Sequence, residues 1–265
     1  MRKRNGWAVI TGASSGIGTE FAIRLAQEGF PLLLVARRED RLKILAECLE
    51  EDYGTACEIV VADLAKVEEC RRLFEELRNK QLSVMINNAG FGLYGSFEGQ
   101  DLEKELGMID VNVRAVHVLT KLSLQKMEKQ HGGYLLNVAS SAGLMPAGPY
   151  MSTYYATKAY VASLTRAVSE ELRENKSPVY VGVLCPGPVK TEFDEIANVQ
   201  FSLDGITAEY CANYAVDCMK RRKPVIIPTL VMKMATTAGR LLPQRVSIRI
   251  TSHQQKKKNC CPTDK

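Results

Sequence analysis

Short apolar runs alternate along this chain with longer amphipathic runs, and this alternation limits the possible fold more than any other feature. The apolar runs lack in-and-out alternation of polar and apolar residues, so the sheet that they form must be covered on both faces. They occupy residues 7–12, 31–37, 57–63, 83–90, 133–140, 179–187 and 224–228. Helical crossovers between parallel strands account for the intervening runs. We expect helices over residues 16–28, 39–52, 66–79, 101–129, 152–174 and 207–221.

The pattern predicts an α/β fold with a doubly wound parallel sheet of about seven strands, in a three-layer α/β/α arrangement. Ligands of such folds bind beyond the carboxyl ends of the strands. Several residues with polar or unusual backbone chemistry fall there, namely Gly12, Arg37, Asp63, Asn87, Ser140 and Pro186. No internal repeat or linker-like stretch interrupts the 265 residues before about residue 229. We therefore expect one domain over residues 1–228 and a C-terminal extension over 229–265.

Cysteine and histidine usage bears on the compartment and on metal binding. The eight cysteines are scattered without a CxxC pair, and the chain has three histidines. We expect reduced thiols in a cytoplasmic protein and no metal site. No apolar run approaches the roughly 20 residues that cross a bilayer, and the N-terminus lacks the pattern of a secretory signal.

The stretch TGASSGIG, residues 11–18, joins the first expected strand to the first helix. Gly12 permits a sharp turn, Gly16 permits close approach of a pyrophosphate, and Gly18 permits close packing of the helix on the sheet. The helix N-terminus adds free N–H groups and a partial positive charge. A tight turn is the plain alternative, but the position after a buried strand favours a Rossmann dinucleotide site.

The end of the second strand indicates which dinucleotide is bound. An NAD site commonly has an acidic residue there, whereas this chain has Ala36, Arg37 and Arg38. Guanidinium groups suit a phosphate, and Ser14 adds a hydroxyl donor. The alternative is that both arginines are ordinary surface residues at a helix start. We predict NADP(H), with Arg37 as the favoured phosphate ligand.

Six motifs occur in one order along the expected sheet: TGASSGIG, NNAG (87–90), Asn112 in VNVRA, NVASSAG (137–143), Tyr154-x-x-x-Lys158 and PGPVKTEF (186–193). Together, over residues 6–228, they resemble the short-chain dehydrogenase/reductase family. Within it, ARR and YYATKAY are similar to a bacterial branch near 3-oxoacyl-CoA reductases and 17-beta-hydroxysteroid dehydrogenases. The resemblance implies a homodimer or homotetramer that pairs through the helices near 101–129 and 152–174.

Tyr154 and Lys158 share one helix face that begins at the cleft. An unperturbed phenol has a pKa of about 10. A nearby ammonium favours the phenolate, so we expect a lowered pKa for Tyr154 and a role in proton transfer. The resemblance also implies that Lys158 bonds the nicotinamide ribose. Tyr155 and Tyr160 are interpreted as packing or pocket-wall residues.

Two adjacent serines compete for the role of carbonyl-binding hydroxyl that the resemblance implies. Ser141 has the usual spacing, thirteen residues before Tyr154. Alignment of the strand end from Asn137 to Gly143 instead selects Ser140, with one extra residue in the following loop. A loop absorbs an insertion, whereas a slipped strand reverses its side chains, so we favour Ser140.

Asn112 lies inside an expected helix, where asparagine is mildly unfavourable. The resemblance implies that it distorts the helix and holds a water in a proton relay to Lys158. It implies further cofactor contacts along the strand ends. Ser15 and Ile17 belong to the contacts of the glycine loop, and Asp63 and Leu64 are expected at the adenine. The residues expected at the adenine ribose are Asn88, Ala89 and Gly90. Those expected near the nicotinamide or phosphate are Pro186, Gly187, Val189 and Thr191.

The segment from about 190 to 208 corresponds to the family's variable substrate loop. Its apolar residues are Phe193, Ile196, Val199, Phe201 and Leu203, and the other walls are expected from Phe91, Leu93, Tyr94, Leu144, Met145 and Tyr150. An apolar pocket suits a fatty-acyl, steroid-like or similar ketone or secondary alcohol. The alternative is that these side chains only pack the loop.

The C-terminal part is strongly basic. Residues 218–263 contain eleven Lys or Arg and no acid, which leaves −6 for the rest of a chain whose net charge is +5. Residues 230–242 have an amphipathic pattern. Three interpretations stay open: the segment closes over the cleft, recognises an anionic carrier or CoA-type substrate, or rests on an acidic membrane surface. Residues 252–265 are expected to be disordered, and aromatics are not interleaved with the charges as nucleic-acid binding would require.

The sequence therefore predicts an NADP-dependent oxidoreductase that transfers a hydride between NADP(H) and a hydrophobic ketone or secondary alcohol. Two alternatives remain at this point. One is a non-catalytic NADP(H)-binding sensor on the same fold, against which the presence of Ser140, Tyr154, Lys158 and Asn112 argues. The other is a membrane- or carrier-associated acyl reductase that uses its basic C-terminus.

Overall fold

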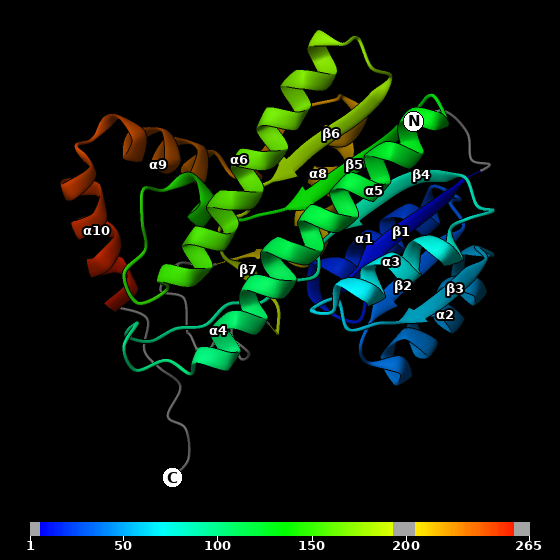
Figure 1. The fold of residues 1–265 in the computed structure, drawn as a ribbon, viewed down its shortest axis with the longest axis horizontal. Coiled ribbons are helices and arrows are strands. Elements are labelled where there is room, and N and C mark those ends of the chain that lie inside the picture. The colour runs from blue at the N-terminus through cyan, green and yellow to red at the C-terminus, as the bar shows by residue number, and fades with distance from the viewer. Residues whose placement is uncertain (1–5, 193–204, 257–265) are drawn as a thin grey trace.

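A seven-stranded parallel sheet runs through the centre of the computed structural model, which describes residues 6–192 and 205–256 (Figure 1). Its strands are β1 (Trp7–Thr11), β2 (Leu32–Ala36), β3 (Cys57–Val61), β4 (Leu82–Asn87), β5 (Gly133–Val138), β6 (Val179–Leu184) and β9 (Val225–Ile226). The strand order is β3-β2-β1-β4-β5-β6-β9, and every neighbouring pair is parallel. The chain reverses its direction of winding between β1 and β4, which confirms the doubly wound fold.

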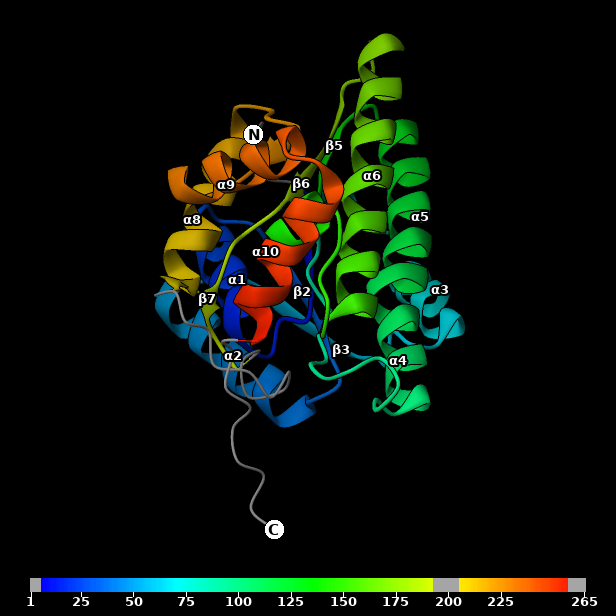
Figure 2. The same ribbon diagram turned by 90° about the vertical axis from the view of Figure 1, so that its left-hand side faces the viewer.

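Helices cover both faces of the sheet, as the three-layer prediction requires. In Figure 2, α1 (Gly16–Gln27), α2 (Glu39–Tyr53) and α8 (Ala208–Lys220) lie on one side. The other side carries α3 (Val67–Glu76), α5 (Val116–Lys129) and α6 (Ser152–Glu174). These bounds agree with the expected helices to within a few residues.

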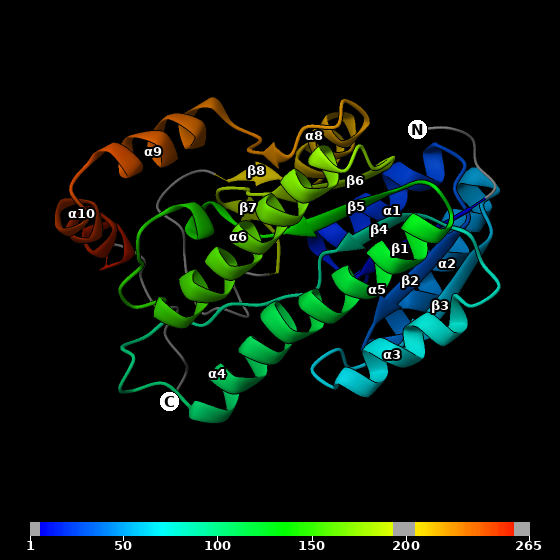
Figure 3. The ribbon, with the colours of Figure 1, turned by 45° about the horizontal axis from the view of Figure 1, so that its top comes forward.

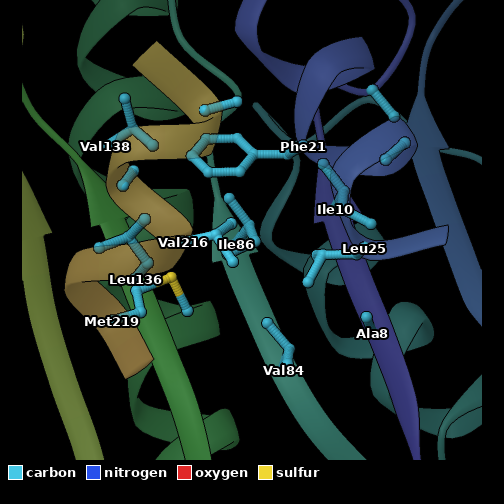
Figure 4. Packing of buried hydrophobic residues seen from close by; sticks show 14 of the residues in the cluster. Ala8, Ile10, Phe21, Leu25, Val84, Ile86, Leu136, Val138, Val216 and Met219 are labelled. Atoms are coloured by element: carbon cyan, nitrogen blue, oxygen red, sulfur yellow. The ribbon is translucent and has the colours of Figure 1, made fainter. Parts of the chain in front are cut away.

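Alternate side chains of each strand pack into two different apolar clusters, one on each face of the sheet. Ile10 and Ile86 point to the cluster under α1 and α8, whereas Val9 and Met85 point to the cluster under α3 and α5. Figure 4 shows the first cluster, with Phe21 of α1 lying among the strand residues. Each fully buried side chain of this size stabilises the fold by roughly 1.5–3 kcal/mol. Burial on both faces is why the strands lack polar alternation.

The helical stretch expected over 101–129 has three parts. It begins as α4 (Leu102–Ile109), passes through a π-helical turn, η1 (Asp110–Ala115), and continues as α5. A short parallel pair, β7 (Val189–Lys190) with β8 (Ile206–Thr207), was not predicted. The apolar side chains expected in the substrate loop lie outside the described residues, which resume at 205.

Two helices follow β9, namely α9 (Leu230–Leu241) and α10 (Gln244–Lys256). The expected disorder from residue 252 is wrong for residues 252–256, which belong to α10; residues 257–265 lie outside the described part. Gln255 explains why α10 stays folded against the body. Its backbone carbonyl accepts a hydrogen bond from Tyr94 Oη at 3.1 Å, and its Nε2 donates to Tyr155 Oη at 2.6 Å. None of the helices described is long and apolar enough to cross a membrane.

Candidate active site

A cavity of about 900 Å³ opens beyond the carboxyl ends of the sheet strands. It brings together nearly all the residues that the sequence singled out. The predicted residues that line it are Gly12, Ser14, Ser15, Gly16, Ile17, Arg37, Arg38, Asp63, Leu64, Asn88, Ala89, Gly90, Ser140, Tyr154, Lys158, Pro186, Gly187, Val189 and Thr191. Gly18 and Asn112 do not line the cavity. They lie behind its wall, where Gly18 packs against Gly12 and Asn112 is hydrogen-bonded to Phe91.

The glycine loop is shaped by close backbone contacts. Gly12 has a φ of 65°, and a Cβ there would lie 2.9 Å from Ala89 Cα. A Cβ on Gly18 would lie 2.0 Å from the Gly12 carbonyl oxygen, so its place is in helix packing and not in the cavity wall. The two positions therefore require glycine for different reasons: a left-handed backbone in one, and contact between helix and loop in the other.

Thr11 and Asn88 hold this loop against β4. Thr11 Oγ1 accepts hydrogen bonds from the backbone N–H of Asn88 and of Ala89, at 3.0 and 3.1 Å. Asn88 Nδ2 donates to the carbonyl oxygens of Thr11 and Gly12, at 3.0 and 3.2 Å. Thr11 was not among the predicted site residues, although its place at the end of β1 was a usable signal. The side chain of Asn88 thus positions the loop.

The N-terminus of α1 faces the same cavity. The side chain of Ser15, its N-cap residue, makes no capping hydrogen bond, and the first turn carries no acidic residue. The first N–H groups of a helix lack partners within the helix, and the helix dipole favours an anion there. The loop and helix start thus form a cradle whose chemistry fits a pyrophosphate.

Ser140 and Tyr154 meet at the end of β5. Ser140 is the N-cap residue of the short helix η2 (Ser141–Leu144), and its Oγ accepts a hydrogen bond from Ala142 N at 3.1 Å. The side chain of Tyr154, from the first turn of α6, is hydrogen-bonded to that of Ser140. Ser141 also lines the cavity, and its backbone N–H donates to Pro186 O at 2.7 Å. The contact with Tyr154 supports Ser140 as the carbonyl-binding serine.

Lys158 lies one helical turn after Tyr154, as their spacing predicted. Its Nζ donates to the carbonyl oxygen of Val138 at 3.0 Å and lies 5.9 Å from the centroid of the Tyr154 ring. Only 5% of Lys158 and 9% of Tyr154 is exposed. The two side chains are therefore enclosed in the same part of the cavity wall.

Burial decides the ionisation of both groups. Desolvation raises the pKa of Tyr154 to about 12, against the opposing effect of the hydrogen bond with Ser140. Desolvation likewise lowers the pKa of Lys158 to about 8. The expected lowering of the Tyr154 pKa is wrong for the side chains as they stand, because desolvation is the largest effect on it and Lys158 is not among the groups that shift it. The phenol is accordingly protonated at neutral pH, as a proton donor must be.

Asn112 occupies the π-helical turn and is fully buried. Its Oδ1 accepts a hydrogen bond from Phe91 N at 3.1 Å, and its Nδ2 donates to Phe91 O at 2.8 Å and to Thr157 Oγ1 at 3.1 Å. A Cβ on Gly90 would lie 2.8 Å from Asn112 Oδ1 and 3.2 Å from Lys158 Nζ. The expected helix distortion is present, and the asparagine lies next to the lysine. Its part in a proton relay stays a prediction.

The two arginines after β2 lie differently. Arg38 Nε donates to Ser14 Oγ at 3.2 Å, and its guanidinium pairs with Glu192 at 3.0 Å, whereas Arg37 is exposed at the cavity rim. Glu192 also pairs with Arg41. Glu192 and Arg41 were not predicted, because nothing local to either residue indicates that the segment after β7 returns to α2.

The substrate side of the cavity departs further from the prediction. Phe91 and Leu93 line it as expected. Leu144 belongs to the core beneath α6, and Tyr94, Met145 and Tyr150 are not in the cavity lining. Their expected places are taken by Met151, Tyr155, Met232, Gln254 and Gln255. The last three come from α9 and α10, which agrees with the interpretation that the C-terminal segment closes over the cleft. The sequence did not indicate which of its side chains line the cavity.

Tyr160 lies outside this cavity on α6, where its Oη is hydrogen-bonded to His117 Nδ1 at 2.7 Å. Its interpretation as a packing residue therefore fits better than that of a pocket wall. Within residues 6–192 and 205–256, no cluster of three or more His, Cys, Asp or Glu side chains could hold a metal ion.

The fold and the site agree with a match over most of the chain: the sequence model described as short chain dehydrogenase covers residues 6–200. The chain belongs to the short-chain dehydrogenase family. A similar relative is rat 17-beta-hydroxysteroid dehydrogenase type 3, 29% identical over 92% of this chain and 83% of the relative. The human enzyme of that name is 31% identical over 75% and 64%, respectively. Zebrafish very-long-chain 3-oxoacyl-CoA reductase-A is 32% identical over 63% of this chain and 53% of its own length.

This short-chain dehydrogenase spans less than two thirds of the human and zebrafish relatives. Among solved structures, a short-chain dehydrogenase from Sphingobium yanoikuyae in complex with NADPH has a TM-score of 0.81 and 31% identity, covering 89% of this chain and 93% of that one. A 7beta-hydroxysteroid dehydrogenase has a TM-score of 0.83 and 25% identity over 93% and 96%. A family member from Burkholderia phymatum in complex with NAD has a TM-score of 0.82 at 24% identity, covering 100% and 99%.

Proposed function

We propose that this chain is an NADP(H)-dependent carbonyl reductase that interconverts hydrophobic ketones and secondary alcohols. One observation carries the proposal. A buried, protonated phenol, Tyr154, is hydrogen-bonded to Ser140 and followed one turn later by Lys158, inside a cavity that also contains the glycine loop. A binding protein without catalysis has no need of a desolvated proton donor beside a second hydroxyl.

Several groups in the cavity lining suit a phosphorylated dinucleotide. The uncapped start of α1 suits the pyrophosphate, and Asp63 and Leu64, which line the cavity, would hold the adenine. Ser14, Arg37 and Arg38 lie together at the rim and suit a 2′-phosphate. This cluster supports NADP(H), as does the NADPH in the Sphingobium structure, although the Burkholderia protein holds NAD.

Bound NADPH would supply the hydride to the carbonyl carbon. The chain's own residues supply the rest of the chemistry. The hydroxyls of Ser140 and Tyr154 would donate hydrogen bonds to the carbonyl oxygen and hold it in place. The Tyr154 proton would pass to that oxygen as the alcohol forms. Lys158, with its ammonium beside the phenol, would stabilise the resulting phenolate, and Asn112 would connect Lys158 to a relay that restores the proton.

The substrate end of the cavity is largely apolar. Phe91, Leu93, Met151 and Met232 contribute to its walls, with Tyr155 beside Tyr154 at a ring-centroid distance of 6.4 Å. Such walls favour a hydrophobic carbonyl. The relatives are named for steroids and for very-long-chain 3-oxoacyl-CoA. We infer a substrate of the steroid-like or 3-oxoacyl type.

Replacement of Tyr154 by phenylalanine tests the proposal. The variant keeps the ring but loses the proton, so kcat/KM should fall by roughly a hundredfold to ten-thousandfold. The measurement is NADPH oxidation with a panel of ketones, oxosteroids and 3-oxoacyl thioesters, with NADPH affinity followed by fluorescence. Retained turnover in Tyr154→Phe, or a wild type that binds no NADPH, would contradict the proposal.

The adjacent serines provide a matched pair for the same assay. Because Ser140, and not Ser141, is hydrogen-bonded to Tyr154 in the structure, Ser140→Ala should lose much more activity than Ser141→Ala. The opposite ranking would move the carbonyl-binding role to Ser141.

A further inference from the structure

The two C-terminal helices direct polar side chains inward. In α10, Ser247, Thr251 and Gln255 are spaced by four residues, form one stripe, and are each less than 5% exposed. Thr236 of α9 is buried as well. The Thr251 hydroxyl donates to Ser247 O and that of Thr236 to Met232 O, at 3.0 and 2.8 Å, so these two hydroxyls are satisfied within their own helices. A polar inner stripe is the reverse of ordinary helix packing in a water-exposed protein.

The outward side of the same helices is apolar. Leu230 is 70% exposed and Leu241 is 83% exposed, and the rest of this outer face is Val231, Met234, Leu242, Val246 and Ile250. Figure 2 looks onto α9 and α10 at the end of the molecule where they lie. Single exposed apolar residues need no explanation, but a group on two consecutive helices marks an interaction surface.

Charge identifies the kind of partner. Lys233, Arg245 and Arg249 are exposed on these helices, and residues 218–263 contain no acidic residue. A second copy placed face to face would bring cations against cations, which is unfavourable. A negatively charged lipid surface suits both the apolar and the basic side chains of this face. The apolar side chains enter the boundary between headgroups and acyl chains, and the basic side chains contact the anionic headgroups.

We propose that the outer face of α9 and α10 binds the surface of an anionic lipid bilayer without crossing it. The inner sides of these helices contribute Met232, Gln254 and Gln255 to the catalytic cavity. In this bound orientation, the cavity wall lies next to the lipid, in which a hydrophobic carbonyl compound dissolves. The binding step does not depend on the proposed reaction.

Sedimentation of the full chain with vesicles tests this proposal. One preparation is phosphatidylcholine alone, and the other contains phosphatidylcholine and phosphatidylglycerol in a three-to-one ratio. The wild type should bind the mixed vesicles in a salt-sensitive manner. Combined Lys233→Gln, Arg245→Gln and Arg249→Gln should weaken binding roughly a hundredfold, at about fivefold for each charge. Combined Leu230→Ser, Val231→Ser, Met234→Ser and Leu241→Ser should abolish it.

The control variant, Ile44→Ser with Tyr53→Ser, alters exposed apolar residues of α2 and should bind as the wild type does. A wild type that stays in the supernatant, or outer-face variants that bind unchanged, would overturn the proposal. So would a change of molecular mass in light scattering caused by the outer-face variants, because that result assigns the face to a second copy. Sedimentation does not report turnover, so its failure is separate from failure of the proposed reaction.

Discussion

Lys158 shows at the scale of one residue how function and stability oppose each other. Its ammonium is enclosed, and desolvation lowers its pKa to about 8, whereas an unfolded lysine titrates near 10.4. Between these values the unfolded chain binds more protons than the folded chain, so the free energy of unfolding rises with pH there. The gain is complete above the unfolded pKa and is lost as the pH falls through about 8. At neutral pH the buried charge therefore destabilises the fold.

Lys158→Met should consequently be more stable than the wild type near neutral pH, despite losing the bond to Val138 O. The expected gain is on the order of 1 kcal/mol, which corresponds to a few degrees in Tm. Thermal unfolding measured from neutral pH to about pH 10 should show the difference shrinking as the pH rises. A difference that does not change with pH would mean that folding does not lower the pKa of Lys158.

Arg37 and Glu192 carry opposite charges at the rim of the cavity, where the cofactor is expected to bind. Arg37→Asp should shift the preference from NADPH toward NADH, because a carboxylate repels the 2′-phosphate and accepts bonds from a 2′-hydroxyl. The affinities of both cofactors, measured by fluorescence titration, give the ratio. Unchanged selectivity would mean that Arg37 does not bind the 2′-phosphate, and the role would fall to Arg38, which contacts Ser14.

Glu192 neutralises Arg38 and Arg41, and both arginines lower the pKa of its carboxyl group. A 2′-phosphate near Arg38 would compete with this carboxylate. Glu192→Gln should therefore tighten NADPH binding by roughly two- to fivefold, the scale of an exposed ion pair, with a smaller effect on NADH. An equal gain for both cofactors would show that the carboxylate acts on something other than the phosphate.

At the scale of elements, the π-helical turn η1 joins α4 and α5 and presents Asn112 to the strand-end loop. A single side chain there satisfies both backbone groups of Phe91 and contacts Thr157 on α6. The turn thus links three segments around the cavity, and this linkage accounts for an asparagine in a helix that would otherwise disfavour it.

Asn112→Leu should lower the free energy of unfolding by roughly 1–3 kcal/mol, because it leaves the Phe91 backbone groups without their partner. Asn112→Asp keeps the acceptor for Phe91 N but sets a carboxylate oxygen against Phe91 O, so it should also be less stable than the wild type. Urea unfolding of the three proteins gives the order. If Asn112→Leu were as stable as the wild type, water would have to replace the amide.

At the scale of the whole molecule, the outer sides of α4 and α6 bear exposed apolar residues, including Leu102, Leu106 and Tyr160. In Figure 3, α4, α5 and α6 run together, and only the start of α6 approaches α10, at Tyr155. Members of this family are typically oligomeric, and we propose that this chain forms a homodimer or homotetramer through these helices.

Leu102→Glu with Leu106→Glu should reduce the mass measured by light scattering to that of one chain, because opposed carboxylates replace apolar contacts. The Leu230→Ser, Val231→Ser, Met234→Ser and Leu241→Ser variant serves as the control and should keep the wild-type mass. A monomeric wild type, or an unchanged mass in the glutamate variant, would contradict this assembly.

The sequence by itself determined the features that arise from local periodicity and backbone sterics. Continuous apolar strands required a sheet covered on both faces, Gly12 required a turn with positive φ, and the four-residue spacing placed Tyr154 above Lys158. These properties depend on residues within one or two turns of each other, so they are visible before any tertiary contact is known.

Only the tertiary structure decided which groups are enclosed and what they meet there. The raised pKa of Tyr154, the bond between Tyr154 and Ser140, and the approach of Gln255 to Tyr155 depend on side chains brought together from distant segments. Desolvation is a property of the finished enclosure and not of any short stretch, so the spacing of Tyr154 and Lys158 could place the two groups but could not give the direction in which the phenol titrates.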